Sequence, residues 1–339
     1  MPVDFTVAIR VYNAEKRIHA LLNALRKQIN TEPISWEIVV VDNNSIDKTA
    51  EIIQEYQENW IKDCPLRYYF EPKQGAVFAR RRTVQEAQGT FIGFLDDDNI
   101  PASNWVATAY QFGQTHPQAG AFGSQIYGDL ETTPPDYFDR IKPFLAIIER
   151  GSNAKLYDPE KLVLPPGAGL VIRQQAWVEN VPNKLVLQGP VAGSLSAKGE
   201  DSEALLYISK GGWEIWYNPE MCVDHKIHKS RLERNYLLSL ARGCGLATCH
   251  LRLINASPLQ KPLIILRNFI GSGRRIVRHL IKYRGQVKSD IVVACEIEFY
   301  KSSMMSSFYY TQKLAKQLLI KVRPKLLPRH KNDLLHLTR

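Results

Sequence analysis

The sequence predicts an α/β protein built on a mostly parallel, Rossmann-like sheet flanked by helices. Two observations carry this prediction. Strand-like and helix-like segments alternate over the first 130 residues, as in a sheet whose strands are joined by crossover helices. The segment WEIVVVD, residues 36–42, is also continuously apolar, as parallel strands are when helices cover both faces of the sheet.

The alternation is regular through the first half of the chain. The segments with strand character are residues 5–12, 36–42, 66–71, 90–96 and 119–128. The segments with helical character are residues 13–28, 45–60, 74–88 and 104–116. In the first of these helices, Ile18, Leu21, Leu22 and Leu25 recur at the three- and four-residue spacing of a buried helix face.

The second half is less regular. Residues 129–160 show no clear periodicity, a strand signal returns after a Gly/Pro turn within residues 163–177, and a helix is expected over about residues 200–210. Two helical stretches follow in a basic segment. The expected units are one domain over residues 1–254, with halves 1–128 and 129–254, and a mainly helical region over residues 255–339.

Charge is unevenly distributed along the chain. The formal net charge is +10, but residues 226–339 alone hold 23 Lys and Arg against 5 Asp and Glu. The preceding residues hold 21 Lys and Arg against 29 Asp and Glu, so an acidic body is followed by a basic end. Such an end suits an anionic partner, either phospholipid or nucleic acid.

The sequence shows no secretion signal and no membrane-spanning segment. Its beginning, MPVDFTVAIRVYNAEKR, has no basic segment followed by a long apolar one, and no apolar run approaches 18 residues. The five cysteines include no C-x-x-C pair, which argues against a disulfide framework and against a zinc ribbon. We therefore expect a cytoplasmic protein with free thiols.

Three aspartates, Asp96, Asp97 and Asp98, follow directly on the apolar segment TFIGFL. Their mutual repulsion is unfavourable unless water, a metal or a cation compensates for it. Open parallel sheets bind ligands at the carboxyl ends of their strands, and carboxylate oxygens there favour Mg²⁺ or Mn²⁺ with phosphate oxygens as further ligands. An acidic surface turn is the alternative interpretation.

Two further acidic features lie where strands end or helices begin. Asp42 closes the strand in VVVDNNS, and Glu200 and Asp201 belong to GEDSEAL. Ordinary helix capping would also explain both features. Neither a P-loop nor a G-x-G-x-x-G fingerprint occurs, so these residues predict a metal-bound nucleotide held without a glycine cradle.

Several motifs in this order resemble the family 2 glycosyltransferases of the GT-A fold, inverting enzymes that use nucleotide-sugar donors. The matching segments are VAIRVYNAEKRI, EIVVVDNNSIDKT, GAVFARRRTVQEAQG, FLDDDNIP and GEDSEAL, within roughly residues 5–250. The resemblance assigns residues 1–128 to donor binding and residues 129–254 to the acceptor. Within the family, the likeness is to cyanobacterial exopolysaccharide transferases, including those for hormogonium polysaccharide.

The resemblance also implies roles for individual residues. The implied donor-binding residues are Arg10, Tyr12, Asp42, Arg80, Asp96 and Asp97. Asp98 and His225 are the implied metal ligands. Asp201 is the implied general base, and Glu200 is expected to orient it or to support the acceptor.

Other residues receive weaker implications. Arg10 stands where the family usually has Pro, and Arg81 where it usually has Asn, which is expected to affect donor choice. Arg231 is a candidate phosphate ligand, like His228 nearby. Gly167 and Gly169 are expected to let backbone approach the sugar. Trp177 and Trp213 suit either sugar stacking or core packing.

The expected function is therefore metal-assisted transfer of a sugar, with a UDP-sugar as the expected donor, to a glycan or lipid-linked acceptor in extracellular polysaccharide synthesis. The basic end is expected to hold the protein on the anionic inner face of the plasma membrane, with no nucleic acid as partner. Two alternatives stay open. A sugar nucleotidyltransferase normally has a glycine-rich loop, which RVYNAEKRI lacks. A nucleic-acid-binding protein normally has a reading motif, which we do not find.

Overall fold

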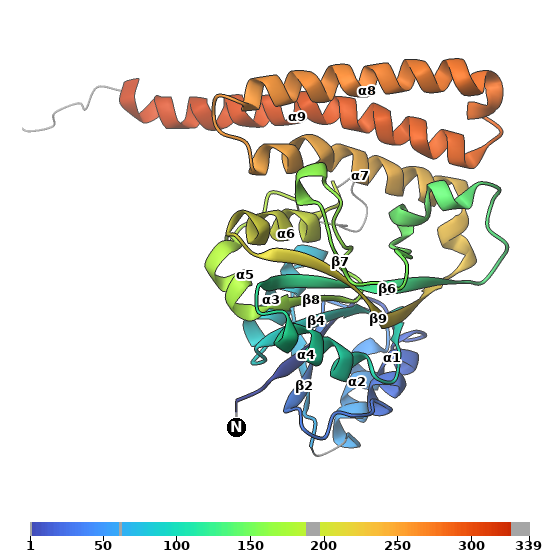
Figure 1. The fold of residues 1–339 in the computed structure, drawn as a ribbon, viewed down its shortest axis with the longest axis vertical. Coiled ribbons are helices and arrows are strands. Elements are labelled where there is room, and N and C mark those ends of the chain that lie inside the picture. The colour runs from blue at the N-terminus through green and yellow to red at the C-terminus, as the bar shows by residue number, and fades with distance from the viewer. Residues whose placement is uncertain (1, 61–62, 188–196, 327–339) are drawn as a thin grey trace, which may run out of the picture.

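The computed structural model describes residues 2–60, 63–187 and 197–326 (Figure 1). Its strands are β1 (Phe5–Val11), β2 (Trp36–Asp42), β3 (Leu66–Phe70), β4 (Phe91–Asp96), β5 (Asn99–Pro101), β6 (Ala119–Leu130), β7 (Lys155–Leu156), β8 (Leu170–Arg173) and β9 (Glu214–Ile227). Its α-helices are α1 (Ile18–Arg26), α2 (Thr49–Glu58), α3 (Ala76–Glu86), α4 (Trp105–Thr115), α5 (Gln174–Asn180), α6 (Glu200–Lys210), α7 (Arg234–Ile254), α8 (Lys261–Tyr283) and α9 (Ile291–Leu326).

The strands form one mixed sheet in the order β3-β2-β1-β4-β8-β6-β9-β5, and β7 pairs with β9. Strands β1 to β4 are mutually parallel, and so are β6 and β9. Strand β8 runs antiparallel to both of its neighbours, β4 and β6. The predicted class, a mostly parallel sheet flanked by helices, is confirmed, and the antiparallel β8 is an addition to it.

The strand order reverses between β1 and β4. From β1 the chain builds β2 and β3 on one side and then returns to add β4 on the other side. The carboxyl ends of β1 and β4 therefore adjoin, with Arg10 in register with Asp96. In sheets of this kind, ligands bind at such a switch point.

Helices cover both faces of the sheet. The predicted apolar face of α1 is buried in one core cluster together with α4 and the inward residues of β1 and β4. A second cluster fills the opposite face beneath α3, α5 and α6. Full burial of each large aliphatic side chain contributes roughly 1.5–3 kcal/mol relative to exposure. At Gly93 a β-carbon would lie 2.6 Å from Trp105, so glycine lets α4 sit directly on β4.

The last three helices lie together at one end of the molecule (Figure 1). α7 lies against the sheet domain, α9 packs on α7, and α8 is the outermost element. Within the described residues, none of the helices has the length and apolar character needed to cross a bilayer.

Candidate active site

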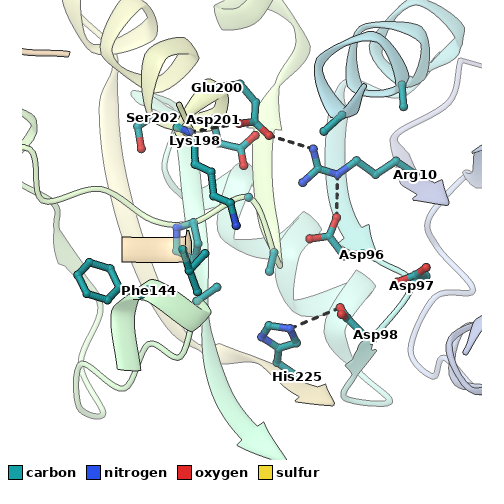
Figure 2. A pocket seen from close by; sticks show the side chains of 18 of the residues that line it. Arg10, Asp96, Asp97, Asp98, Phe144, Lys198, Glu200, Asp201, Ser202 and His225 are labelled. Atoms are coloured by element: carbon teal, nitrogen blue, oxygen red, sulfur yellow. Dashed lines mark hydrogen bonds and ion pairs between the residues drawn. The ribbon is translucent and has the colours of Figure 1, made fainter. Parts of the chain in front are cut away.

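A cavity of about 700 Å³ opens at the carboxyl ends of β1 and β4 (Figure 2). One side is formed by the β1 end, the three aspartates after β4 and the start of α3. The other side is formed by residues 164–168, the start of α6, β9 and α7. Both halves of the sheet domain therefore contribute to one site.

Each aspartate of the 96–98 segment is paired with an arginine from a different part of the chain. The pairs are Arg10–Asp96, Arg17–Asp97 and Arg231–Asp98, with N···O distances of 2.8, 2.7 and 2.6 Å. The arginines come from β1, from the loop before α1 and from the short turn after β9. Guanidinium groups thus supply the compensating charge that three adjacent carboxylates require.

The pairing separates the pKa values of the two neighbouring carboxyls. Burial alone would raise the pKa of Asp96, but the charge and hydrogen bond of Arg10 lower it to about 2. Burial raises the pKa of Asp97 to about 6, although the hydrogen bond from Arg17 opposes the change. Asp96 is therefore ionised throughout the neutral range, whereas Asp97 holds its charge less firmly.

Asp98 and His225 meet because β5 pairs with β9. The register sets Asn99 opposite His225, and the Asn99 side chain donates a hydrogen bond to Asp98 Oδ1 over 3.0 Å. His225 Nε2 lies 3.5 Å from Asp98 Oδ1 (Figure 2). The same nitrogen lies 2.9 Å from Arg231 Nη1. His225 Nδ1 is buried without a hydrogen-bond partner in the described structure.

The donor set around Asp98 fits a divalent cation that takes its other ligands from phosphate. Within residues 2–60, 63–187 and 197–326, no cluster of three or more His, Cys, Asp or Glu side chains is placed to hold a metal. Mg²⁺ commonly binds one or two carboxylates together with substrate phosphates, so Asp98 would be the carboxylate ligand of such an ion, with His225 beside it. Arg231 contacts both groups, Asp98 Oδ2 through its Nη2 and His225 Nε2 through its Nη1.

Glu200 and Asp201 begin α6 and face the aspartates across the cavity. Glu200 accepts a hydrogen bond from Arg10 Nη1 over 3.3 Å, so Arg10 joins Asp96 to α6 (Figure 2). Asp201 Oδ1 lies 2.8 Å from Arg80 Nε, in an ion pair that lacks hydrogen-bond alignment. Burial raises the pKa of Asp201 to about 6, while the charge of Arg80 opposes the rise.

Arg80 is almost fully buried and lies against Asp201. Its guanidinium stacks 4.2 Å above the Phe94 ring, and its three side-chain nitrogens have no hydrogen-bond partner among the described residues. Burial lowers the pKa of Arg80, and the charge of Asp201 opposes this effect. The structure thus brings Arg80 to the implied base.

Gly167 makes room for this ion pair. A β-carbon at Gly167 would lie 2.0 Å from Asp201 Oδ2 and 2.5 Å from Arg80 Nη2. Gly169, at φ +62°, lies against Ser124 instead, and a β-carbon there would be 2.7 Å from the Ser124 hydroxyl. The close backbone approach at Gly167 is thus made to the Asp201–Arg80 pair.

Asp42 is buried at the end of β2 and organises the loop that follows. Its Oδ1 accepts a hydrogen bond from the Ser45 amide over 2.9 Å, and its Oδ2 accepts one from the Tyr68 hydroxyl over 3.1 Å. The next residue, Asn43, lines the cavity together with Tyr12. Both hydrogen bonds of Asp42 are therefore structural, as the capping interpretation of VVVDNNS predicts.

Other residues lie at the site although the sequence did not single them out. Arg17, Asn43 and Lys198 line the cavity. Burial lowers the pKa of the Lys198 amine. The three adjacent aspartates indicate that cationic side chains lie nearby, but nothing in the sequence identifies Arg17 as one of them.

The remaining candidates lie elsewhere. Trp177 and Trp213 pack against the second core cluster, as the packing interpretation predicts. His228 lies at the surface, 3.2 Å from Glu131.

This fold, with carboxylates from two elements at its switch point, defines a class: the GT-A glycosyltransferases. A mannosyltransferase from Pyrobaculum calidifontis, solved with GDP-Man and Mn²⁺, shares the fold with a TM-score of 0.55 and 16% identity over 90% of this chain and 88% of that one. TarS 1–349 from S. aureus, solved with UDP-GlcNAc, has a TM-score of 0.50 and 16% identity over 92% of each chain.

Residues 6–176 match the profile of glycosyl transferase family 2, and the chain belongs to that family. A putative teichuronic acid biosynthesis glycosyltransferase, TuaG of Bacillus subtilis, is 28% identical over 127 residues, which are 38% of this chain and 48% of TuaG. The Escherichia coli UDP-Glc:α-D-GlcNAc-diphosphoundecaprenol β-1,3-glucosyltransferase WfgD is 35% identical over 106 residues, which are 31% of this chain and 38% of WfgD. The chain thus spans less than half the length of these two curated relatives.

Proposed function

We propose that this protein transfers a sugar from a nucleoside-diphosphate sugar to a glycan or lipid-linked acceptor, with inversion at the anomeric carbon, in the synthesis of a cell-surface polysaccharide. The observation that carries the proposal is one cavity in which the aspartates after β4 face Glu200 and Asp201 at the start of α6. Donor activation and acceptor deprotonation each need a carboxylate. In this cavity, one set of carboxylates lies at the end of β4 and the other at the start of α6.

UDP-sugars are the first donors to test. Two relatives support this choice, because WfgD is named for its use of UDP-Glc and TarS was solved with UDP-GlcNAc. The WfgD name also states a diphosphoundecaprenol-linked acceptor, which supports a lipid-linked acceptor here. In this proposal Tyr12, Asp42 and Asn43 form the nucleoside side of the site, and Asp96 lies near the ribose.

Asp98 and His225 would hold Mg²⁺ or Mn²⁺ against the donor diphosphate. When bound, the cation offsets the negative charge that develops on the departing nucleoside diphosphate. Arg231 contacts both protein groups and is a bidentate donor, so it can turn to the diphosphate when Asp98 changes partner. The Mn²⁺ in the mannosyltransferase structure supports the same class of cation.

Asp201 is the proposed general base. Its pKa of about 6 leaves it ionised at neutral pH but more basic than an ordinary aspartate. The ion pair with Arg80 fixes its orientation, and Gly167 allows this arrangement. It would accept the proton of the acceptor hydroxyl as the oxygen attacks the face of the sugar opposite the diphosphate, which gives inversion. Glu200 positions Arg10 and does not accept the proton.

Asp201→Asn is the central test. The amide keeps the size of the side chain but removes its basicity, so transfer should fall about 10²- to 10⁴-fold. Nucleotide affinity should stay close to that of the unaltered protein, because Asp201 is proposed to contact the acceptor. Transfer is measured with a panel of nucleotide sugars and Mn²⁺ or Mg²⁺. Near-normal transfer would move the base elsewhere, and loss of nucleotide binding would place Asp201 in the donor site.

A further inference from the structure

Helix α8 buries only polar residues and exposes many of its apolar residues. Its buried residues are Asn268, Ser272 and His279. Its exposed large apolar residues are Leu263, Leu266, Ile270, Val277, Leu280 and Ile281. A surface helix in water normally shows the reverse arrangement. This inversion implies that the outer face of α8 contacts an apolar phase.

The exposed residues form a continuous face. Positions 263, 266, 270, 277 and 281 are separated by three, four or seven residues, which places them along one side of a helix. Met305 and Phe308 of the neighbouring α9 are exposed as well, and Phe308 contacts Phe269 of α8 edge to face. Because α8 is the outermost element (Figure 1), no other described element covers this face.

Hydrogen bonds hold α8 in this orientation. The Asn268 amide donates to the Ser303 carbonyl over 2.8 Å and to the Ser307 hydroxyl over 3.0 Å. The hydroxyls of Ser272 and Ser303 are 3.1 Å apart. Turning the apolar face inward would break these bonds and leave buried polar groups without partners, so the outward apolar face is a stable feature of the fold.

The same surface is strongly basic. Residues 234–289 contain 11 Lys and Arg and no Asp or Glu. On α8 the exposed cations are Arg267, Arg274, Arg275, Arg278 and Lys282. The glutamates of α9 are turned inward, where Glu296 pairs with Arg140 and Glu298 with Arg242. The outer surface therefore combines an apolar face with unopposed positive charge.

We propose that α8 lies in the interface of an anionic phospholipid bilayer, parallel to the membrane plane. Its apolar face enters the acyl boundary and its arginines contact headgroup phosphates. The layer beneath α8 includes α7, which also contributes Leu240 and Cys244 to the cavity. The acceptor side of the site would thus lie close to lipid, a consequence that rests on the proposed function, whereas the docking itself does not.

Full-length protein binding to vesicles tests the apolar face. Leu266 and Ile281 are 53% and 69% exposed, and Ile29 and Val178, on the sheet domain, are 51% and 72% exposed. Leu266→Ser with Ile281→Ser should lower partition onto phosphatidylcholine–phosphatidylglycerol vesicles at least about tenfold. The matched control, Ile29→Ser with Val178→Ser, should bind like the unaltered protein. Equal binding by both double variants overturns the proposal.

A second pair of variants tests the charge. Arg274→Gln with Arg278→Gln should reduce partition about 25-fold, since each basic residue near an anionic surface contributes roughly a fivefold factor. Lys27→Gln with Lys184→Gln removes the same charge from the sheet domain and should have little effect. Added salt should weaken binding of the unaltered protein, and vesicles of phosphatidylcholine alone should bind it poorly. Equal loss in both variants would show a general charge effect and overturn the assignment to α8.

A site-specific readout identifies the contacting element. Brominated lipids should quench the fluorescence of the tryptophan introduced by Val277→Trp, whereas they should not quench that of the tryptophan introduced by Val178→Trp. Quenching of neither tryptophan overturns the proposal. The proposal is also overturned if the protein does not bind vesicles but forms a dimer that Leu266→Ser with Ile281→Ser dissociates. Retention on DNA without binding to vesicles overturns it as well. Hydrolysis of a soluble nucleotide sugar, measured on the same samples, reports the proposed function separately.

Discussion

Burial at the start of α6 raises the pKa of Asp201 to about 6, against the opposing charge of Arg80. A base must be deprotonated, so kcat/KM should fall about tenfold per pH unit below 6 and level off above it. Stability should move the other way. Because the folded pKa lies above the ordinary value of 3.8, the contribution of Asp201 is largest below that value and is lost as pH rises through about 6.

The fall in kcat/KM below pH 6, the acidic limb of the pH profile, should disappear from the residual activity of Asp201→Asn. Asp97 titrates in the same range, so Asp97→Asn is the control, and its profile should keep the limb. If the fall in kcat/KM at low pH vanished in the Asp97 variant and persisted in the Asp201 variant, the titrating group would be Asp97 and the prediction for Asp201 would be wrong.

Arg231 should compete with a divalent cation for Asp98. Its Nη2 lies 2.6 Å from Asp98 Oδ2, so Arg231→Gln removes a positive charge next to the proposed ligand. We expect the affinity for Mn²⁺ alone to rise about tenfold, because losing a nearby like charge at protein dielectric is worth ~1–2 kcal/mol. Calorimetry without nucleotide measures this. Arg17→Gln, which frees Asp97 instead, should have a smaller effect, and unchanged Mn²⁺ affinity in the Arg231 variant would contradict the competition.

The sequence revealed the carboxylates of the site but not their partners. Asp96 to Asp98 and Asp201 stand out locally, because acidic residues after an apolar strand or at a helix start are unusual or motif-like. Arg10 and Arg231 were expected to contact the donor, and Arg17 was not singled out, since an arginine in the sequence carries no sign of which distant carboxylate it will meet. Their pairing depends on strand register and on the turn after β9.

At the scale of elements, the loop before β8 fixes the position of Asp201, the proposed base. Gly167→Ala places a methyl group 2.0 Å from Asp201 Oδ2, so the carboxylate must move. A displacement near 1 Å can cost about 100-fold in rate, and we expect transfer to fall by that order while nucleotide binding persists. Gly285→Ala is the control, because no atom lies within 4 Å of its β-carbon position. Comparable losses in both variants would point to a general effect on the fold.

The elements that the sequence predicted are those with local signals. The alternating strands and helices up to β4 carry their own periodicity, and they are confirmed. β5 and β9 were not predicted. β5 has three residues, and β9 is a long strand interrupted by Pro219 with a shift in its pairing to β6. Both take their role from the antiparallel pairing that brings His225 to Asp98, which no local pattern encodes.

At the scale of the whole molecule, α7 connects the cavity of the sheet domain with the outer helices α8 and α9. One part of it contributes Leu240 and Cys244 to the cavity, and it also packs along α9. At Gly245 a β-carbon would lie 2.5 Å from the Phe299 carbonyl, so α7 and α9 are in very close contact. A tilt of the outer helices would therefore reach the wall of the cavity that holds Leu240 and Cys244 through packed backbone and not through a flexible linker.

The arginine partners of the aspartates also set the overall charge of the site. The carboxylates that line the cavity are Asp96, Asp97, Asp98, Glu200 and Asp201. The cations that line it are Arg10, Arg17, Lys198 and Arg231, and Arg80 lies buried against Asp201. The protein groups of the site are thus close to electroneutral. A nucleoside-diphosphate sugar with two negative charges and a divalent cation enter as a neutral pair, so joint binding leaves that balance intact.

Dissolved salt should therefore have little effect on binding at this site. Donor affinity measured with metal should change little with ionic strength, because neither the site nor the neutral pair carries a net charge to screen. Nucleotide measured alone should also show a shallow salt dependence, but its affinity should be lower at every ionic strength, because its two negative charges stay uncompensated. Titrations of one nucleotide with and without Mg²⁺ across a salt series measure both slopes, and a steep slope for the nucleotide alone would contradict the charge balance. A site built in this way is expected to take the proposed donor and cation together as a single uncharged unit.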